Sequence, residues 1–392
     1  MVVHDSYGHS AQCIEEAKRN EVISMKLVLT GGCTGGHIYP ALAVGDKFRS
    51  EDPDSEVIYI AKGEDLERKI IPSHGYELIE VDSTWLDRSN PARALKTIRR
   101  TVNGRRDARR VMKRFKPDAV FSTGSFVSVP VVLAAKSLGI PVYLHEQNGF
   151  PGVSNRMAAR FARRVFLGFR TAGEYFSQKE KIIYSGNPVR EEFSGRDKKA
   201  DRESLGIPAD DLVIMVFGGS LGSETTNSVG EAIAREYAGR EGITVIWGTG
   251  IEYYDSIRAR LDKEGFCPSN VRISAYIANM PEMLSASDLC VSRSGALSTA
   301  EMTMAGRAAI FIPSPNVTAD HQYYNAKAVA DAGGAVIVRE EETAEATAET
   351  VLGIVRSLEA DRSEIDRMAD ASRSIAPAEA ADIIYKTIME TC

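Results

Sequence analysis

The chain repeats one arrangement twice: a strongly apolar run, a glycine-rich turn and then a helix-like segment. In the first copy Leu27 to Leu29 precede residues 30–37 (TGGCTGGH), and in the second Leu212 to Phe217 precede residues 218–223 (GGSLGS). A continuous apolar run is typical of a strand that is buried on both faces of a parallel sheet. A strand, a tight turn and a helix open many doubly wound α/β domains. The repetition therefore predicts two such domains in tandem, with a cleft between them.

Further apolar runs extend both halves, and helix-like segments separate them. They lie at residues 57–60, 78–81, 118–122 and 141–144, and then at 244–247, 288–291 and 308–312. Strands that alternate with helices favour parallel sheets. The alternation lapses at residues 185–190, before a polar run at 194–203, so we expect a first domain over 25–185 and a second over 186–375. Residues 376–392 are expected to form a helix that packs back on the first domain. Residues 1–24 have no clear period and are expected to be a disordered extension or translation from a wrong start.

The first glycine turn suits an anionic or hydroxyl-rich ligand. Glycine lets the backbone approach a ligand where a Cβ would clash, and the N-terminus of the following helix carries a partial positive charge. The spacing matches neither the dinucleotide fingerprint nor the P-loop. His37 stands at the end of this turn, with a side chain that exchanges a proton near neutral pH. A glycine turn that binds no ligand is the alternative interpretation.

Composition excludes several classes of protein. The 392 residues exceed what one core usually supports. No apolar run approaches the ~18–20 residues of a membrane-spanning helix, and the first residues lack the order of a signal peptide, which favours the cytoplasm. The five cysteines contain no C-x-x-C pair, so the sequence indicates neither a disulfide framework nor a zinc site.

One stretch is strongly basic although the chain has a net charge of −6. From Arg88 to Lys116 it contains twelve Lys or Arg residues and a single acid, Asp107. Apolar side chains are interleaved with the basic ones. Basic and apolar residues on one helix favour an anionic membrane surface. Nucleic acid is the competing partner, but the acidic remainder and the absence of a recognised binding motif disfavour it. The residues expected at the membrane are Trp85, Leu86, Arg99, Arg100, Arg105 and Arg106.

Three polar clusters follow predicted strands. Residues 293–301 (RSGALSTAE) place small residues and hydroxyls at a helix start, which suits a phosphate, and Glu301 one turn later suits a ribose diol. Residues 321–325 (HQYYN) offer amides for sugar hydroxyls, as do Gln147 and Asn148. Each cluster taken alone is equally well explained as a polar helix start with an ordinary cap.

Taken together, these motifs resemble the MurG family of bacterial glycosyltransferases. The matching residues are 34–37 (TGGH), 145–149 (HEQNG), 186–190 (GNPVR), 218–220 (GGS), 292–301 (SRSGALSTAE), and Gln322 with Asn325, in the family's order. The resemblance implies two Rossmann-like domains in the GT-B fold. It implies an inverting transfer of N-acetylglucosamine from UDP-N-acetylglucosamine to undecaprenyl-pyrophosphoryl-muramyl-pentapeptide (lipid I), which gives lipid II for peptidoglycan synthesis. It also implies no cofactor, no catalytic metal, no nucleic acid, and a peripheral position on the cytoplasmic face of the cell membrane.

The resemblance also assigns roles to matching positions. His37 corresponds to the residue usually discussed as the base. The other roles are Thr34, Gly35 and Gly36 in the cleft, Asn148 at the donor sugar, Arg190 and Ser220 at the diphosphate or nucleotide, Ile277 at the uracil, Ala296, Leu297 and Ser298 at phosphates and sugar, Glu301 at the ribose, and Gln322 at the N-acetylglucosamine hydroxyls.

The sequence departs from the family at several positions. Cys33 stands where glycine is usual, residues 124–130 (GSFVSVP) replace a pattern richer in glycine and tyrosine, and Leu221 and Ser223 replace commoner residues. Residues 124–130 are expected to form a loop on the acceptor side, so a different lipid-linked or glycolipid acceptor is an alternative. A UDP-sugar 2-epimerase shares the architecture but does not need the basic stretch. A non-catalytic binding subunit is disfavoured because His37, Arg190 and Glu301 are retained together with Gln322.

Overall fold

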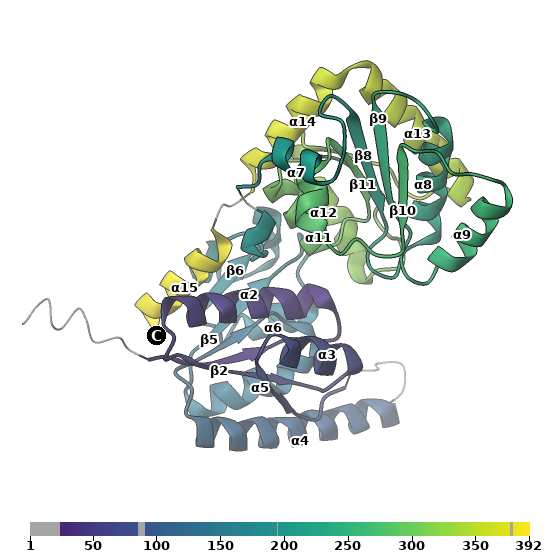
Figure 1. Ribbon diagram of the computed structural model, residues 1–392. Helices are drawn as coiled ribbons and strands as arrows, with labels where there is room; N and C mark the ends of the chain where they lie inside the picture. The colour runs from purple at the N-terminus through teal and green to yellow at the C-terminus, as the bar shows by residue number, and fades with distance from the viewer. Residues whose placement is uncertain (1–23, 85–90, 194, 377–378) are drawn as a thin grey trace, which may run out of the picture.

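The glycine turns follow the central strands of two separate parallel sheets (Figure 1). The structure is a computed structural model that describes residues 24–84, 91–193, 195–376 and 379–392. The expectation for residues 1–24 therefore lies, apart from Ser24, outside the described residues. The membrane role expected of Trp85 and Leu86 lies outside them as well.

The first sheet has seven parallel strands in the order β3-β2-β1-β4-β5-β6-β7. The chain order reverses between β1 and β4, and ligands of doubly wound sheets bind at such a point. The loop after β1, which leads to His37 in the first turn of α2, and the loop after β4, which contains Thr123, therefore meet at one edge. The strands are β1 (Lys26–Thr30), β2 (Glu56–Ala61), β3 (Glu77–Glu80), β4 (Ala119–Ser122), β5 (Val142–Glu146), β6 (Arg164–Leu167) and β7 (Ile182–Tyr184).

Helices cover both faces of this sheet. They are α2 (Gly35–Glu51), α3 (Asp65–Ser73), α4 (Pro91–Phe115), α5 (Ser125–Leu138) and α6 (Val153–Ala158), with short 3₁₀ helices η1 (Arg170–Tyr175), η2 (Lys179–Lys181) and η3 (Glu191–Phe193). The last helix, α15 (Ala380–Thr391), returns from the other lobe and lies against α2 (Figure 1). Its buried Ile384 and Ile388 join the apolar cluster that contains Leu27 of β1.

The second sheet has six parallel strands in the order β10-β9-β8-β11-β12-β13. Its strands are β8 (Leu212–Phe217), β9 (Ile243–Gly248), β10 (Val271–Ser274), β11 (Leu289–Ser292), β12 (Ala308–Phe311) and β13 (Ala335–Ile337). The chain order reverses between β8 and β11, the strands that precede residues 218–223 and 293–301. Its helices are α7 (Lys198–Ser204), α8 (Glu224–Glu236), α9 (Tyr254–Lys263), α10 (Met280–Ala286), α11 (Ala296–Met304), η4 (Thr318–Asp320), α12 (His321–Asp331), α13 (Ala344–Ala360) and α14 (Arg362–Ser374).

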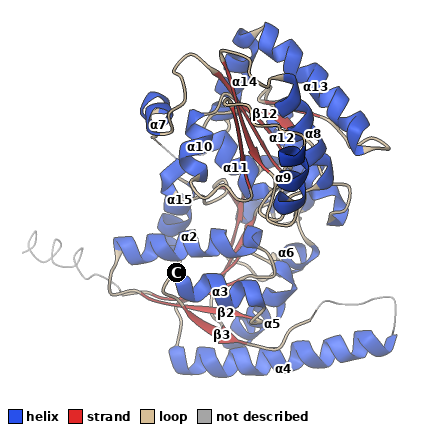
Figure 2. Ribbon diagram, turned by 45° about the vertical axis from the view of Figure 1, so that its right-hand side comes forward, coloured by secondary structure: helices blue, strands red, loops and turns tan. Residues whose placement is uncertain are grey.

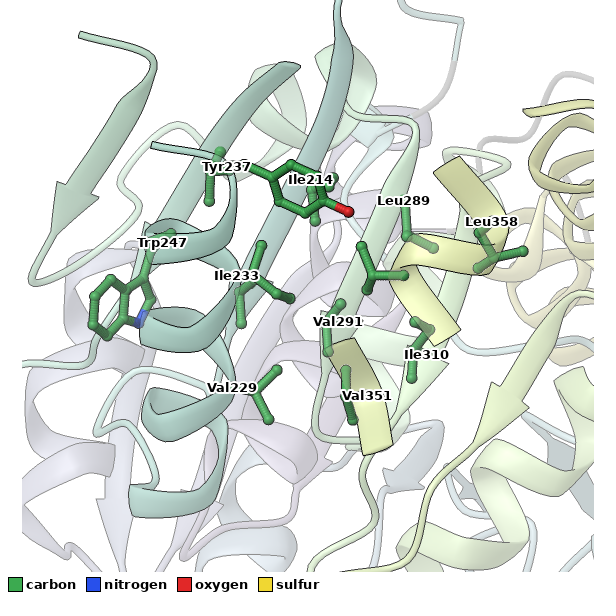
Figure 3. Packing of buried hydrophobic residues seen from close by; sticks show 14 of the residues in the cluster. Ile214, Val229, Ile233, Tyr237, Trp247, Leu289, Val291, Ile310, Val351 and Leu358 are labelled. Carbon is green, nitrogen blue, oxygen red and sulfur yellow. The ribbon is translucent and has the colours of Figure 1, made fainter. Parts of the chain in front are cut away.

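One of the two apolar clusters of the second lobe lies between its sheet and helices α8 and α13 (Figure 3). All six residues of β8 are buried, as expected of a central parallel strand. Val229 and Ile233 of α8 meet Val351 of α13 over Val291 of β11. Burial of each such side chain stabilises the fold by about 1.5–3 kcal/mol. This core makes a rigid support for the loops at the strand ends.

Every strand expected from an apolar run is present, and both sheets are doubly wound as predicted. Strands β6, β7, β10 and β13 were not expected, because these short segments do not stand out as apolar runs in the sequence. The expectation of a loop over residues 124–130 is wrong, since α5 begins at Ser125. The limits at 185/186 and 375/376 stay predictions.

Helix α4 lies along the outer side of the first lobe, on the side away from the second lobe (Figures 1 and 2). Its inward face contacts α5. Gly104 on this face lets the helix lie close to the segment after β3, because a Cβ there would lie 1.9 Å from the carbonyl oxygen of Asp82. No helix in the described part of the chain is both long and apolar enough to cross a membrane.

Candidate active site

The first glycine turn owes two of its glycines to packing inside the protein. A Cβ on Gly31 would lie 1.9 Å from Thr123 Oγ1, and one on Gly32 would lie 2.0 Å from Glu67 Oε1. The expectation that glycine keeps space for a ligand is therefore wrong at these two positions. At Gly36 a Cβ would meet nothing closer than Thr34 Oγ1 at 3.7 Å. Only there does the turn leave open space beside the backbone.

The turn is held in a strained conformation. Cys33 has φ 70° and Ser125, at the start of α5, has φ 69°. Such left-handed backbone costs of the order of 1–3 kcal/mol for a residue with a Cβ. The fully buried carboxylate of Glu67 stabilises it by accepting hydrogen bonds from the Cys33 N–H at 2.9 Å and the Gly63 N–H at 2.7 Å. The chain thus fits a side chain where the family usually has glycine.

His37 lies in the first turn of α2, half-buried, with its ring against the loops after β4 and β5. Its Nδ1 is 2.9 Å from the carbonyl oxygen of Thr123 and 3.1 Å from Gln147 Oε1. Burial holds the pKa of His37 below its usual value, although the Glu146 carboxylate opposes this shift. The neutral ring, which can accept a proton, therefore prevails at neutral pH.

Helix α11 presents an uncapped N-terminus. Its N-cap residue is Gly295, which has no side chain to accept from the first N–H groups. By contrast, the Ser223 side chain caps α8 and also accepts a hydrogen bond from Arg293 Nη2 at 2.6 Å. Free N–H groups at a helix start attract phosphate groups. The anion site in the second lobe is therefore expected at α11, while Arg293 braces the loop before α8.

A cavity of about 290 Å³ lies between the two lobes. It joins the first turn of α11 to the loop after β8 and to the linker between the sheets. Six of the residues expected at the donor line this cavity: Arg190, Ser220, Ile277, Leu297, Ser298 and Glu301. The lining does not include Thr34, Gly35, Gly36, His37, Asn148, Ala296 or Gln322. Among the described residues, no group of three or more His, Cys, Asp or Glu side chains is placed to hold a metal ion.

Tyr39 and His74 also line this cavity, from the first lobe, and Tyr276 lines it from the second. The sequence interpretation missed all three. The Tyr39 and His74 rings meet edge to face with centroids 6.2 Å apart. Tyr39 lies on α2 and His74 caps the end of α3. No local pattern marks these residues, because only the packing of the two lobes brings them to the cavity.

The residues expected at the sugar form a bridge between the lobes. Asn325 Oδ1 accepts from the Gly149 N–H at 2.7 Å, and Asn325 Nδ2 donates to Asn148 Oδ1 at 3.2 Å. Gln322 Oε1 accepts from the Ser314 N–H at 2.9 Å. Among the described residues no hydrogen bond from Gln322 Nε2 is found, so its N–H donors are open to a ligand. Asn148 and Gly149 of the first lobe thus lie at the interface with α12 of the second.

The carboxyl of Glu301 lies deep in the cavity. Burial raises its pKa to about 7, and the nearby Arg190 guanidinium opposes the rise. A carboxylate accepts hydrogen bonds only, so Glu301 suits a pair of hydroxyl groups. Its ionisation near neutral pH makes binding at this end of the cavity sensitive to pH.

Two family models match the chain: the glycosyltransferase family 28 N-terminal domain at residues 27–167 and its C-terminal domain at 213–384. A protein of Desulfitobacterium hafniense (strain Y51) named UDP-N-acetylglucosamine--N-acetylmuramyl-(pentapeptide) pyrophosphoryl-undecaprenol N-acetylglucosamine transferase is 35% identical, over 94% of this chain and 99% of its own length. The protein of the same name from Lactococcus lactis subsp. cremoris (strain MG1363) is 39% identical, over 93% of this chain and 99% of its own.

Solved structures agree with this relationship. The crystal structure of Acinetobacter baumannii MurG matches with a TM-score of 0.73 and 26% identity, over 93% of this chain and 99% of that one. A UDP-GlcNAc 2-epimerase from Neisseria meningitidis has a TM-score of 0.67 at 17% identity, over 93% of this chain and 100% of its own, which is a likeness of fold alone. Near-full-length identity of this size to transferases, over both lobes, means that the chain belongs to the MurG family of glycosyltransferases.

Proposed function

We propose that the protein transfers N-acetylglucosamine from UDP-N-acetylglucosamine to the muramyl-pentapeptide of lipid I and so forms lipid II for peptidoglycan. The observation that carries this proposal is the cavity between the lobes, which combines the uncapped start of α11 with Arg190 and Glu301. His37 lies on the facing lobe. UDP-N-acetylglucosamine is a substrate, and the chemistry requires no further cofactor.

In the proposed mechanism, the N–H groups at the start of α11 hold the diphosphate, together with the Arg190 guanidinium. Ser220 and the backbone of Ile277 contact the nucleotide, and Glu301 accepts from the ribose hydroxyls. Both the helix dipole and the guanidinium stabilise the negative charge that grows on the departing UDP. These groups supply the charge stabilisation for which other transferases use a divalent cation.

The acceptor enters from the other side of the cleft. Its hydroxyl oxygen attacks the anomeric carbon, the bond from that carbon to the UDP oxygen breaks, and its electron pair leaves with UDP. His37 takes the proton of the attacking hydroxyl. Attack opposite to the leaving group inverts the anomeric centre. The N–H groups of Gln322 suit the sugar hydroxyls. Asn148 contacts the same sugar beside its hydrogen bond to Asn325.

The proposal of a UDP-sugar 2-epimerase has less support than that of a transferase. Three UDP-N-acetylglucosamine 2-epimerases of similar fold are 14–17% identical to this chain, whereas the transferases of Caldicellulosiruptor saccharolyticus and Lactococcus lactis are 34% and 39% identical over 93% of it. A different lipid-linked acceptor is the remaining alternative, and the strained Cys33 and Ser125 on the acceptor side motivate it.

We further propose that the protein binds the cytoplasmic face of the cell membrane peripherally through α4. The outward face of this helix exposes Ile98 and Val102, at 56% and 43%. Arg99, Arg105 and Arg106 are exposed on the same stretch. Arg100 is half-buried and its guanidinium lies 3.6 Å from Asp82, so it contributes less.

The decisive assay is the release of UDP from UDP-N-acetylglucosamine, with and without a short-chain lipid I. We expect release that depends on lipid I and gives a β-1,4-linked disaccharide. Release that depends on another glycolipid instead would support the alternative acceptor. Formation of the 2-epimer of the sugar without any acceptor would contradict the transferase.

Donor binding is expected to weaken as the pH falls below about 7. Only the Glu301 carboxylate accepts from both ribose hydroxyls, and its pKa in the empty cavity is about 7, so the protonated form predominates at lower pH. Titration calorimetry with UDP between pH 6 and 8 measures the effect. Glu301→Gln should bind UDP less tightly and with little dependence on pH. A parent protein whose UDP affinity is constant over this range would contradict the ribose assignment.

A further inference from the structure

The His37 ring is engaged on one nitrogen. The carbonyl oxygen of Thr123 can only accept a hydrogen bond, so the 2.9 Å contact from His37 Nδ1 places the proton on Nδ1. Gln147 Oε1 shares this proton at 3.1 Å. Within the described residues no hydrogen bond to His37 Nε2 is found. The lone pair of the neutral ring is therefore on Nε2.

The orientation of the Gln147 amide follows from its other neighbours. Gln147 Nε2 lies 3.1 Å from the carbonyl oxygen of His145 and 3.0 Å from His145 Nδ1. The reversed amide would place its oxygen against that carbonyl and its N–H groups against the His37 Nδ1–H. Both contacts would be repulsive. Gln147 is 1% exposed, so water cannot relieve them, and Oε1 must face His37.

His145 closes the chain of hydrogen bonds. Its Nε2 lies 2.9 Å from the carbonyl oxygen of Gly186, so Nε2 carries the proton and Nδ1 accepts from Gln147. The ring is fully buried, and this burial lowers its pKa to about 4. His145 therefore stays neutral and keeps one tautomer at neutral pH. Every proton from His37 to Gly186 is thus assigned.

We propose that Gln147 and His145 are positioning residues which fix the tautomer of His37, so that Nε2 is the one atom able to take the acceptor proton. This inference rests on the proposed function, in which His37 is the base. The hydroxyl proton moves to the Nε2 lone pair while the oxygen bonds to the anomeric carbon and UDP leaves with its electron pair. The ring becomes an imidazolium whose Nδ1–H still donates to Thr123 and Gln147.

The charged and titratable groups around His37 fit this role. His145 and Glu146 act on it from β5 and its following loop, and His321 acts on it from α12. Glu146 is 1% exposed, and its carboxylate accepts from the Gly152 N–H at 3.0 Å and Asn155 Nδ2 at 2.9 Å. It forms no hydrogen bond to His37, so it stabilises the imidazolium through space. The tautomer is set instead by the two acceptors on Nδ1–H, the Thr123 carbonyl and Gln147 Oε1.

The tautomer is measurable without any turnover. The chain has six histidines, and ¹⁵N-histidine labelling of the whole protein distinguishes protonated from unprotonated ring nitrogens. We expect His37 with its proton on Nδ1 and His145 with its proton on Nε2 at pH 7.5, with signals assigned by His37→Asn and His145→Asn. A proton on His37 Nε2 in the parent protein would overturn the inference, whatever the substrate of the enzyme is.

Two substitutions give opposite shifts in the pH dependence. The acid limb of the pH profile is the range in which kcat falls because His37 becomes protonated. Gln147→Glu places a carboxylate beside the His37 Nδ1–H and should shift this limb to higher pH by about one unit or more. Gln147→Leu removes one of the two acceptors on the His37 Nδ1–H and should shift that limb to lower pH. It should also lower kcat by about tenfold or more with little change in KM for UDP-N-acetylglucosamine. Purely structural damage would lower kcat without moving the limb.

Asn270→Leu is the matched control, because this amide makes several hydrogen bonds to the backbone of the second lobe. It should destabilise the fold while leaving the acid limb in place. Acid limbs of both Gln147 variants that coincide with the parent would overturn the inference. No turnover by the parent with lipid I would instead count against the proposed function, and the tautomer measurement would still decide the inference.

Discussion

His37→Ala is expected to lower kcat by roughly 10²–10⁴-fold, the usual contribution of a positioned general base. The affinity for UDP should change little, because His37 does not line the cavity that holds Arg190, Ser220 and Glu301. The reason for the loss is the missing lone pair on Nε2. Single-turnover transfer of labelled N-acetylglucosamine and titration of UDP separate the two effects.

His37→Asn is the sharper version of this experiment. An asparagine side chain still places an N–H donor near the carbonyl oxygen of Thr123, so the turn after β1 keeps its support, but it has no group that accepts a proton. We expect it to be as inactive as His37→Ala and as stable as the parent. In the parent, kcat should fall on the acid side only below pH 6.5, because burial lowers the pKa of His37. Full turnover by either variant would remove His37 as the base.

The sheets were predictable because their central strands are long and apolar. The run from Leu212 to Phe217 is buried along its whole length. An apolar run of this length before a glycine turn is typical of a central parallel strand. The short strands β7 and β13 depend on their neighbours in the sheet rather than on their own residues. The start of α5 could not be predicted either, because residues 124 and 125 have the sequence of a turn. Both have a positive φ, although the helix begins at Ser125.

The candidate site was predictable only where a residue sits on a motif. The glycine turn and residues 294–301 mark the ends of β1 and β11, so His37 and Glu301 could be found from the sequence. Tyr39 and His74 could not, since they reach the cavity through the packing of α2 and α3 against the second lobe. The glycines of the first turn led to a wrong expectation. Gly31 and Gly32 lack a Cβ because Thr123 and Glu67 occupy that space, and a sequence alone does not show such neighbours.

The faces of α4 explain why its charge is available to a membrane. Its inward face at Gly104, Ala108 and Met112 is buried, and these positions recur at the spacing of one helix face. Ile98 and Val102 project outward with exposed arginines beside them. A solvated helix usually mixes both signs of charge, whereas this one has a single acid, Asp107, which lies 3.1 Å from Arg110. The outward face therefore combines apolar contact with unbalanced positive charge.

Replacing Arg99, Arg105 and Arg106 by glutamate is expected to weaken binding to vesicles rich in anionic lipid by about 100-fold or more. Each basic residue near such a surface contributes about 1 kcal/mol, and the new carboxylates add repulsion. Sedimentation with vesicles of anionic or zwitterionic lipid measures the loss, which should shrink as salt screens the surface.

Glutamate at the exposed Lys199, Lys263 and Lys386 makes the same change in net charge away from α4 and should have a much smaller effect. If both triple variants lose equal affinity, net charge alone governs attraction to the membrane; if the α4 variant binds as the parent does, the basic face is only solvated. Turnover of a water-soluble acceptor should be unaffected in either variant, because α4 lies on the side of the first lobe away from the second lobe (Figure 2) and none of its described residues lines the cavity.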